Sequence, residues 1–165
     1  MIAFQIAVDH PERVRSMVII NSGPALVPRT AAEWLKIRQR LILARVFGPA
    51  QTGKFLSTRL FPKSDQSALR DRLIELWAEN DKDAYLASIH ALVGWSVLER
   101  IPEIGCPVLV ISGDRDYTPL SRKAEYTALI PDARLVIIED SGHATPIDQP
   151  EKFNACVLEF LNSIT

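Results

Sequence analysis

Residues 106–119 read CPVLVISGDRDYTP, and this stretch decides the predicted fold. It contains a short run of apolar and mostly β-branched residues, Val108–Ile111, which is bounded by a proline and a glycine. Such a run is typical of a strand that is buried on both faces of a parallel sheet. Two carboxylates, Asp114 and Asp116, follow this run. They therefore lie at the carboxyl end of the predicted strand, which is where open parallel sheets place their active sites.

The chain on either side of this stretch alternates between helices and strands. Residues 2–9 (IAFQIAVD) predict a buried helix that ends at a proline, and residues 15–21 (RSMVIIN) predict a buried strand. After the central strand, residues 120–129 predict a helix, residues 134–139 (RLVIIE) a third strand, and the segment from Asp148 a last amphipathic helix. This order predicts an α/β fold with about three parallel strands and flanking helices.

A long helical segment, residues 28–100, interrupts this alternation. It is far longer than the crossover between two neighbouring parallel strands needs to be. We therefore predict two domains. Residues 1–27 and 101–165 form the core, and residues 28–100 form an inserted helical cap or lid.

Local signals divide the predicted cap into helices. Thr30 with Glu33 forms a capping box, Gly48-Pro49 predicts a break, and Asp81 predicts another helix start. Large aromatic side chains in this segment allow two interpretations, a substrate pocket or the core of the cap itself. These residues are Trp34, Phe47, Phe55, Trp77 and Trp95.

Composition excludes several classes of function. The chain has 165 residues with a formal net charge of −1, so it has no charge pattern for nucleic acid or an anionic membrane surface. The three histidines lack metal-ligand spacing and no glycine-rich dinucleotide loop is present, so we predict no metal and no cofactor. No apolar run is long enough to span a membrane. Cys106 and Cys156 have apolar neighbours, which predicts buried thiols in the cytoplasm.

Asp116 and His143 each follow a predicted strand. Because neighbouring parallel strands end at the same edge of a sheet, we expect the two side chains to lie within reach of one another. A carboxylate in that place accepts the Nδ1–H of the imidazole, fixes its tautomer and stabilises the imidazolium that forms when the ring takes a proton. The pair is the acid–base half of a hydrolytic triad.

These motifs resemble the C-terminal portion of the α/β-hydrolase fold family. The resemblance covers nearly the whole chain, and residues 28–100 are its least diagnostic part. It rests on the acid turn at 106–119, the histidine turn DSGHATPIDQPEKF at 140–153, and the segment AFQIAVDHPERVRSMVIIN at 3–21.

The resemblance implies a role for each member of the pair. In the family, the chain order is nucleophile, acid and histidine. Asp116 is implied as the acid because it stands third after Gly113, and His143 is implied as the base. Asp148 stands where the family ending usually has glutamate.

Three other carboxylates are assigned structural roles. Asp114 is the competing acid, but a residue directly after the glycine more often faces solvent or binds loop amides. Asp140 precedes Ser141-Gly142 and is predicted to form a turn. Asp148, with Glu151, is predicted to cap the last helix.

No residue of the chain is a credible nucleophile. The family places it on a G-x-S-x-G elbow, whose small residues permit a strained backbone. Gly94-Trp95-Ser96 matches the first half of that motif, but Leu98 replaces the second glycine. The resemblance implies that residues 2–9 are the helix directly after the elbow. Three interpretations remain open: a fragment or misassigned start, one half of a split protein, or a non-catalytic remnant.

The predicted function is therefore that of the C-terminal portion of an α/β-hydrolase of the esterase, lipase or acyl-hydrolase type. The complete enzyme is expected to act on a small apolar acyl or alkyl substrate through a Ser, Asp or Cys nucleophile, and the chain alone is expected to be inactive. The alternative is a binding or assembly module without catalysis. In either case the apolar edge at residues 15–21 predicts a homo-oligomer or a complementing chain.

Overall fold

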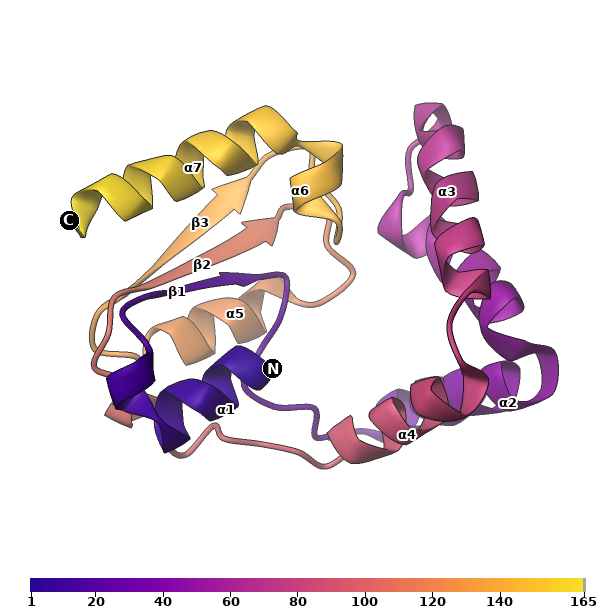
Figure 1. Cartoon of the computed structure of the whole chain (residues 1–165), viewed down its shortest axis with the longest axis horizontal. Helices are drawn as coiled ribbons and strands as arrows, with labels where there is room; N and C mark the ends of the chain where they lie inside the picture. Colours follow the sequence, from indigo (N-terminus) through magenta and orange to yellow (C-terminus); the bar gives the residue numbers. More distant parts are fainter. Residues whose placement is uncertain (165) are drawn as a thin grey trace. The chain divides into compact units, whose positions relative to one another are not determined.

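The structure, a computed structural model, describes residues 1–164. Three strands, β1 (Met17–Ile20), β2 (Val108–Gly113) and β3 (Ala133–Ile138), form one parallel sheet in the order β1-β2-β3 (Figure 1). The prediction of an α/β fold built on three parallel strands is confirmed.

The central strand β2 is buried along its whole length. Val110, near its middle, pairs with Ile19 of β1 on one side and with Leu135 of β3 on the other. Because neighbouring strands cover both edges and helices cover both faces, the strand has no solvent-facing side to carry polar residues. This is the environment that the apolar run predicted.

Helices pack on both faces of the sheet. Helices α1 and α5 lie on one face and α7 lies on the other (Figure 1). Phe4 of α1 meets Tyr126 of α5 edge to face, with ring centroids 5.7 Å apart. Phe160 of α7 packs with Leu109 and Ile111 of β2. The bounds are Ile2–Asp9 for α1, Leu120–Thr127 for α5 and Pro150–Ser163 for α7, with 3₁₀ turns at Pro11–Arg13 and Ile101–Glu103.

The chain divides into two compact units. One consists of Met1–Ala25 together with the chain from Ser96 onward, and contains the sheet. The other, Leu26–Trp95, is helical. Its helices are α2 (Ala31–Leu60), α3 (Ser67–Ala78) and α4 (Lys82–Leu92), with a 3₁₀ turn at Ser64–Gln66.

The local signals in the helical unit act as predicted. Thr30 Oγ1 accepts a hydrogen bond from the Glu33 amide at 3.2 Å, and Asp81 Oδ1 accepts one from the Ala84 amide at 2.7 Å. Each bond satisfies an amide that has no partner within its own helix. Gly48 has a φ of 77°, which interrupts α2 immediately before Pro49. The predicted break is confirmed.

The aromatic residues of the helical unit divide between two environments. Trp34, Phe47 and Phe55 are 48%, 62% and 45% exposed. For these three the interpretation as cap core is wrong. Trp77 packs against Tyr85, with ring centroids 5.6 Å apart, and its side chain covers Gly53, where an added Cβ would lie 2.7 Å from the Trp77 Cβ.

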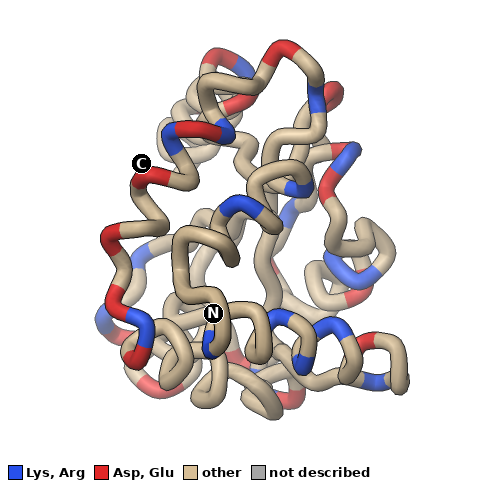
Figure 2. The backbone as a smooth tube through the Cα atoms, turned by 90° about the vertical axis from the view of Figure 1, so that its right-hand side faces the viewer, with Lys and Arg blue, Asp and Glu red and all other residues tan. Residues whose placement is uncertain are grey.

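Charged residues of both signs are interspersed along the backbone (Figure 2). Over the described part of the chain, none of the helices combines the length and the apolar character that crossing a membrane requires.

Candidate active site

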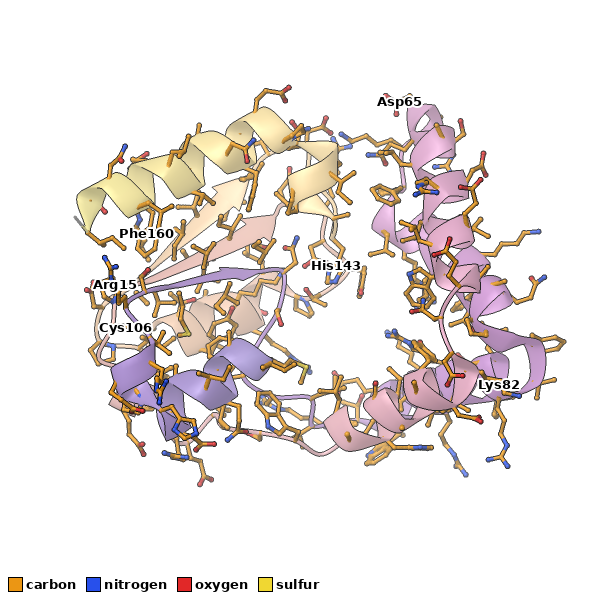
Figure 3. All side chains as sticks on the ribbon, viewed as in Figure 1. Arg15, Asp65, Lys82, Cys106, His143 and Phe160 are labelled. Atoms are coloured by element: carbon orange, nitrogen blue, oxygen red, sulfur yellow. The ribbon has the colours of Figure 1, made fainter. Side chains whose placement is uncertain are left out.

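The acid and histidine turns meet at the carboxyl edge of the sheet. Asp116 lies in the loop between β2 and α5, and His143 lies in the turn between β3 and a short helix, α6 (Thr145–Asp148). Figure 3 shows His143 at this end of the sheet, with Arg15 and Cys106 at the opposite end.

Asp116 and His143 are in direct contact. The distance from His143 Nδ1 to Asp116 Oδ1 is 2.8 Å, and the side chains are 26% and 1% exposed, respectively. An ionised carboxylate only accepts, so Nδ1 carries the hydrogen and donates it. The lone pair is then on Nε2, the nitrogen that accepts a proton in a triad. The structure brings the predicted pair together, and its catalytic roles stay a prediction.

Asp116 is held in its ionised form by several donors. Its Oδ1 also accepts from the Thr118 amide at 3.1 Å, and its Oδ2 accepts from Thr118 Oγ1 and Lys123 Nζ. Burial alone would raise the pKa of Asp116, but the hydrogen bonds from His143, Lys123 and Thr118 outweigh it and lower the pKa to about 2. The carboxylate is therefore charged at neutral pH.

Lys123 is a member of the site that the sequence analysis missed. Its side chain is 3% exposed, and its ammonium donates to Asp116 Oδ2, to Ser112 Oγ at 2.8 Å and to Asn21 Oδ1 at 3.2 Å. Burial lowers the pKa of the Lys123 ammonium, and the Asp116 carboxylate opposes that shift. All three ammonium hydrogens thus have an acceptor, and these bonds offset the desolvation cost of burying the charge.

A signal for Lys123 was present in the sequence. Lys123, Tyr126, Thr127 and Ile130 recur at helical spacing, and all four are buried in the structure. A lysine within the buried stripe of a helix needs an acidic partner, and Asp116 lies one loop upstream.

Asn21, directly after β1, is hydrogen-bonded both to the end of β2 and to the histidine turn. It is 4% exposed and has a φ of 46°, a left-handed conformation that asparagine tolerates. Its Nδ2 donates to the carbonyl of His143 at 2.8 Å and to Thr145 Oγ1 at 2.8 Å, and its Oδ1 accepts from the Gly113 amide at 3.0 Å. The predicted strand at 15–21 is shorter in the structure, where β1 begins at Met17 and ends at Ile20, directly before the left-handed Asn21.

Asp148 does not cap the last helix, so this prediction is wrong. The N-cap of α7 is Gln149, which makes no side-chain cap hydrogen bond. The Asp148 carboxylate instead accepts from Ser141 Oγ at 2.9 Å and from the Gly142 amide at 2.7 Å. Asp148 therefore braces the turn that carries His143.

The remaining acids behave as predicted. Asp114 Oδ1 accepts a hydrogen bond from the Ser141 amide at 2.9 Å. It therefore binds a loop amide, as predicted, while Asp116 contacts His143. Burial would raise the pKa of Asp114, but backbone hydrogen bonds, first that from Ser141, lower it below its usual range. Asp140 has a φ of 59° in the turn and pairs with Arg115 at 2.9 Å.

Gly113 sets the distance between the two turns. A Cβ at this position would lie 2.3 Å from the carbonyl oxygen of Ser141 and 2.4 Å from that of Gly142. Both contacts are with backbone, which cannot move aside as a flexible side chain can. Only glycine lets the end of β2 approach the histidine turn this closely.

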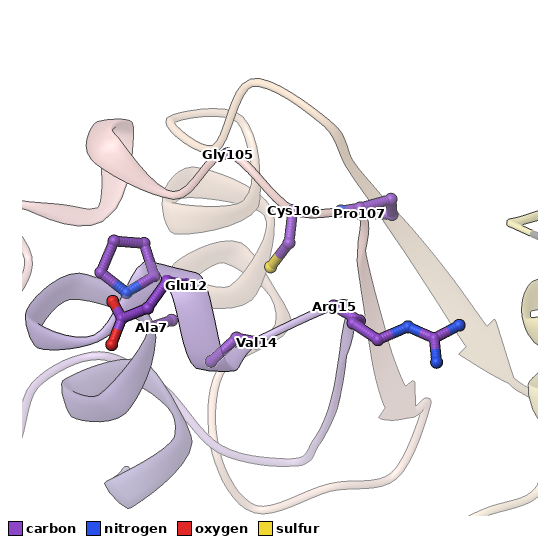
Figure 4. Close-up of a pocket in the computed structure, with 8 residues that line it drawn as sticks. Ala7, Glu12, Val14, Arg15, Gly105, Cys106 and Pro107 are labelled. Atoms are coloured by element: carbon purple, nitrogen blue, oxygen red, sulfur yellow. The ribbon is translucent and has the colours of Figure 1, made fainter.

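A hollow of about 470 Å³ lies at the other edge of the sheet, where β1 and β2 begin (Figure 4). It is lined by Ala7, Pro11, Glu12, Val14, Arg15, Gly105, Cys106 and Pro107. Asp116 and His143 are not part of its lining. Within residues 1–164, no three His, Cys, Asp or Glu side chains are grouped to hold a metal ion.

The low pKa of Asp116 predicts an acid-dependent loss of stability. Because its folded pKa of about 2 lies below the ordinary value of 3.8, the unfolded state takes up the proton first. Asp116 therefore contributes about 2 kcal/mol above pH 4 that is lost as the pH falls through about 2. The free energy of unfolding of the wild type and of Asp116→Asn is measured in urea from pH 6 to pH 2. The difference between the two should become smaller by about 2 kcal/mol over this range. A difference that stays constant over that range would contradict the prediction.

The chain resembles curated proteins over its whole length. The chain is 30% identical over 171 residues to the "Putative carbamate hydrolase RutD" of Pseudomonas savastanoi pv. phaseolicola, an alignment that covers 100% of this chain and 65% of the relative. It therefore spans less than two thirds of that protein's length.

Two solved structures share the fold. The enol-lactonase from Burkholderia xenovorans LB400 has a TM-score of 0.84 at 23% identity, covering 96% of this chain and 60% of the other. A thermophilic esterase from Thermogutta terrifontis has a TM-score of 0.82 at 20% identity, covering 99% and 61%. The sequence model described as "Alpha/beta hydrolase family" matches residues 1–155. The sheet, the two turns at its carboxyl edge and this match show that the chain belongs to the α/β-hydrolase family.

Proposed function

We propose that this chain supplies the acid and the base of a nucleophile–histidine–acid triad that hydrolyses a carboxylic ester or a related bond. The 2.8 Å contact between His143 Nδ1 and the buried Asp116 carboxylate carries the proposal. In the complete enzyme a nucleophile attacks the carbonyl carbon while His143 Nε2 takes its proton. The imidazolium then delivers that proton to the leaving group, and Asp116 holds the ring and stabilises its charge.

The names of three of the similar proteins support this reaction class. A carbamate hydrolase, an enol-lactonase and an esterase are each named for a substrate with an acyl carbon bonded to a heteroatom. Attack on such a carbon needs a base that activates the nucleophile and later protonates the leaving group. The Asp116–His143 pair is suited to both steps.

We propose that the nucleophile comes from sequence outside these residues. The serines of the acid turn and of the histidine turn, Ser112 and Ser141, are fully buried and already bonded. Ser112 Oγ donates to the Gly113 carbonyl, and Ser141 Oγ lies 2.9 Å from both Asp148 Oδ1 and Thr145 Oγ1. Neither hydroxyl is presented to a substrate.

The test compares two polypeptides in a p-nitrophenyl ester assay. The 165-residue chain is expected to hydrolyse the ester at the background rate. If the coding sequence continues upstream in frame through a G-x-S-x-G motif, the extended polypeptide is expected to turn the ester over. Hydrolysis by the chain alone that His143→Ala abolishes would reveal a nucleophile within it. An extended polypeptide that binds the ester without cleaving it would favour a binding module.

We also propose a small apolar acyl or alkyl substrate. The exposed aromatic side chains of Trp34, Phe47 and Phe55 support this, because they give the helical unit apolar surface that a hydrocarbon chain can cover. In the extended polypeptide, kcat/KM should be higher for a butyrate ester than for an ester whose acyl chain carries a carboxylate.

The two cysteines support a cytoplasmic location, which we include in the proposal. Cys106 and Cys156 are free thiols in half-buried positions. Burial raises the pKa of each thiol, which makes both less reactive. Free thiols of this kind are typical of proteins in a reducing compartment.

We further propose that β1 pairs with another chain or another copy of this one. In the described sheet, β1 is hydrogen-bonded to β2 on one side only, so its other side presents backbone donors and acceptors. Ile2 and Ile6 of the adjacent helix α1 are 76% and 41% exposed. Light scattering on the 165-residue chain should show a dimer or larger assembly. A monodisperse monomer would contradict the prediction.

A further inference from the structure

We propose that Lys123 is a positioning residue of the acid–base pair: its ammonium orients and neutralises the Asp116 carboxylate, and so limits how tightly His143 holds a proton. The inference rests on the proposed function, because it assigns Lys123 a task only if His143 acts as a base. Lys123 belongs to α5, which neither motif of the triad includes.

Lys123 fixes the orientation of the carboxylate. Asp116 Oδ1 faces His143, and Oδ2 faces the Lys123 ammonium. The ammonium is itself anchored by Ser112 at the end of β2 and by Asn21 after β1. Because these acceptors stand at the ends of two paired strands, the carboxylate cannot rotate without breaking a charge-assisted hydrogen bond. Oδ1 therefore stays aimed at Nδ1.

Lys123 also changes the charge that His143 experiences. An ionised carboxylate in contact with an imidazole favours the imidazolium, but a base that is already protonated cannot accept a proton from the nucleophile. The Lys123 and Asp116 side chains are 3% and 1% exposed, so water screens their charges little. Lys123 therefore offsets much of the negative potential of Asp116 at the ring.

The other charged groups around the histidine turn have partners of their own. Asp148 binds Ser141 and the Gly142 amide, Asp114 binds the Ser141 amide, and Arg115 pairs with Asp140. Tyr117 places its ring over the imidazole, with centroids 4.4 Å apart. Among residues 1–164, Lys123 is the cation recorded in contact with the oxygen of Asp116 that faces away from His143.

The test measures the proton affinity of His143 directly. Histidine resonances of the 165-residue chain are followed by NMR over pH in the wild type and in Lys123→Met, whose unbranched apolar side chain fills a similar space. Comparison with His143→Gln assigns the signal. The midpoint of this signal's titration is expected to move to higher pH in Lys123→Met, because the variant removes the cation that faces the Asp116 carboxylate. The control is Lys152→Met, which removes an exposed lysine bonded to the Glu139 carbonyl and should leave the signal unchanged.

The outcomes separate the proposal from a purely structural role. If Lys123 served folding alone, Lys123→Met would lower the free energy of unfolding and leave the His143 titration where it is; that result overturns the proposal. If Lys123→Met does not fold, ¹⁵N NMR of the wild-type Lys123 Nζ decides. A protonated ammonium throughout the titration of His143 supports the proposal, and a neutral amine at pH 7 overturns it. Neither readout needs a nucleophile, so failure here is distinct from failure of the ester assay.

Discussion

Replacing His143 with alanine is expected to lower kcat/KM for a p-nitrophenyl ester by about 10³–10⁴-fold in the polypeptide that carries the nucleophile. The substitution removes the imidazole that contacts Asp116 and whose Nε2 lone pair takes the nucleophile's proton in the proposed triad. Asp116→Asn is expected to lower kcat/KM by a similar factor. The asparagine NH₂ group can stand in place of Oδ1 and donate a hydrogen to Nδ1, which stabilises the tautomer that carries its hydrogen on Nε2 and cannot accept the nucleophile's proton. Initial rates at saturating and limiting ester concentrations measure both effects.

Two other histidines provide matched controls for this substitution. His10 and His90 are both exposed, and His10 lies 3.8 Å from Glu12. His10→Ala and His90→Ala should each keep kcat/KM within about twofold of the wild type, because surface substitutions away from a site have small effects. Full activity in His143→Ala would refute the assignment of the base.

Asp116→Asn is also expected to reduce the free energy of unfolding at pH 7 by about 3 kcal/mol. The variant leaves the Lys123 ammonium, 3% exposed, without a counter-charge. Removing one partner of a buried ion pair costs more than the pair contributes, since the remaining charge has neither water nor an opposite charge. Urea denaturation followed by circular dichroism gives the value.

A double variant tests the cause of this loss. Asp116→Asn with Lys123→Met removes both charges and should recover most of the lost stability without recovering activity. Asp132→Asn is the matched control, because Asp132 has an exposed side chain and should change stability by less than about 0.5 kcal/mol. A double variant that is less stable than Asp116→Asn would show that the ion pair is not the source of the loss.

Sequence patterns were sufficient for the sheet and for the pair at its edge. The run at Val108–Ile111 favours a strand buried on both faces, because it is short, mostly β-branched and bounded by a proline and a glycine. The position of Asp116 and His143 follows from topology, since parallel strands end at one edge. Neither inference needs knowledge of side-chain packing.

The residues behind the pair were not predictable in the same way. Lys123 and Asn21 are polar, and patterns of hydrophobicity assign polar residues to the surface. Their burial depends on acceptors that come from other segments, which only the tertiary structure brings together. Asp148 was misassigned for a related reason: its spacing from Glu151 fits a capping box, but the helix begins with Pro150 and the carboxylate binds the preceding turn.

Asn21 also has a consequence for the order of folding. Its side-chain hydrogen bonds reach residues 121, 122 and 124 positions away in the chain. Contacts at such separation carry a high loop-closure cost and form late on the folding pathway. The Asn21 hydrogen bonds to the histidine turn are therefore present only while β1 is docked on β2, and the buried Gly113 amide, bonded to Asn21 Oδ1, exchanges its hydrogen only when that docking is undone. The rate of hydrogen exchange at the Gly113 amide therefore reports how often β1 separates from β2.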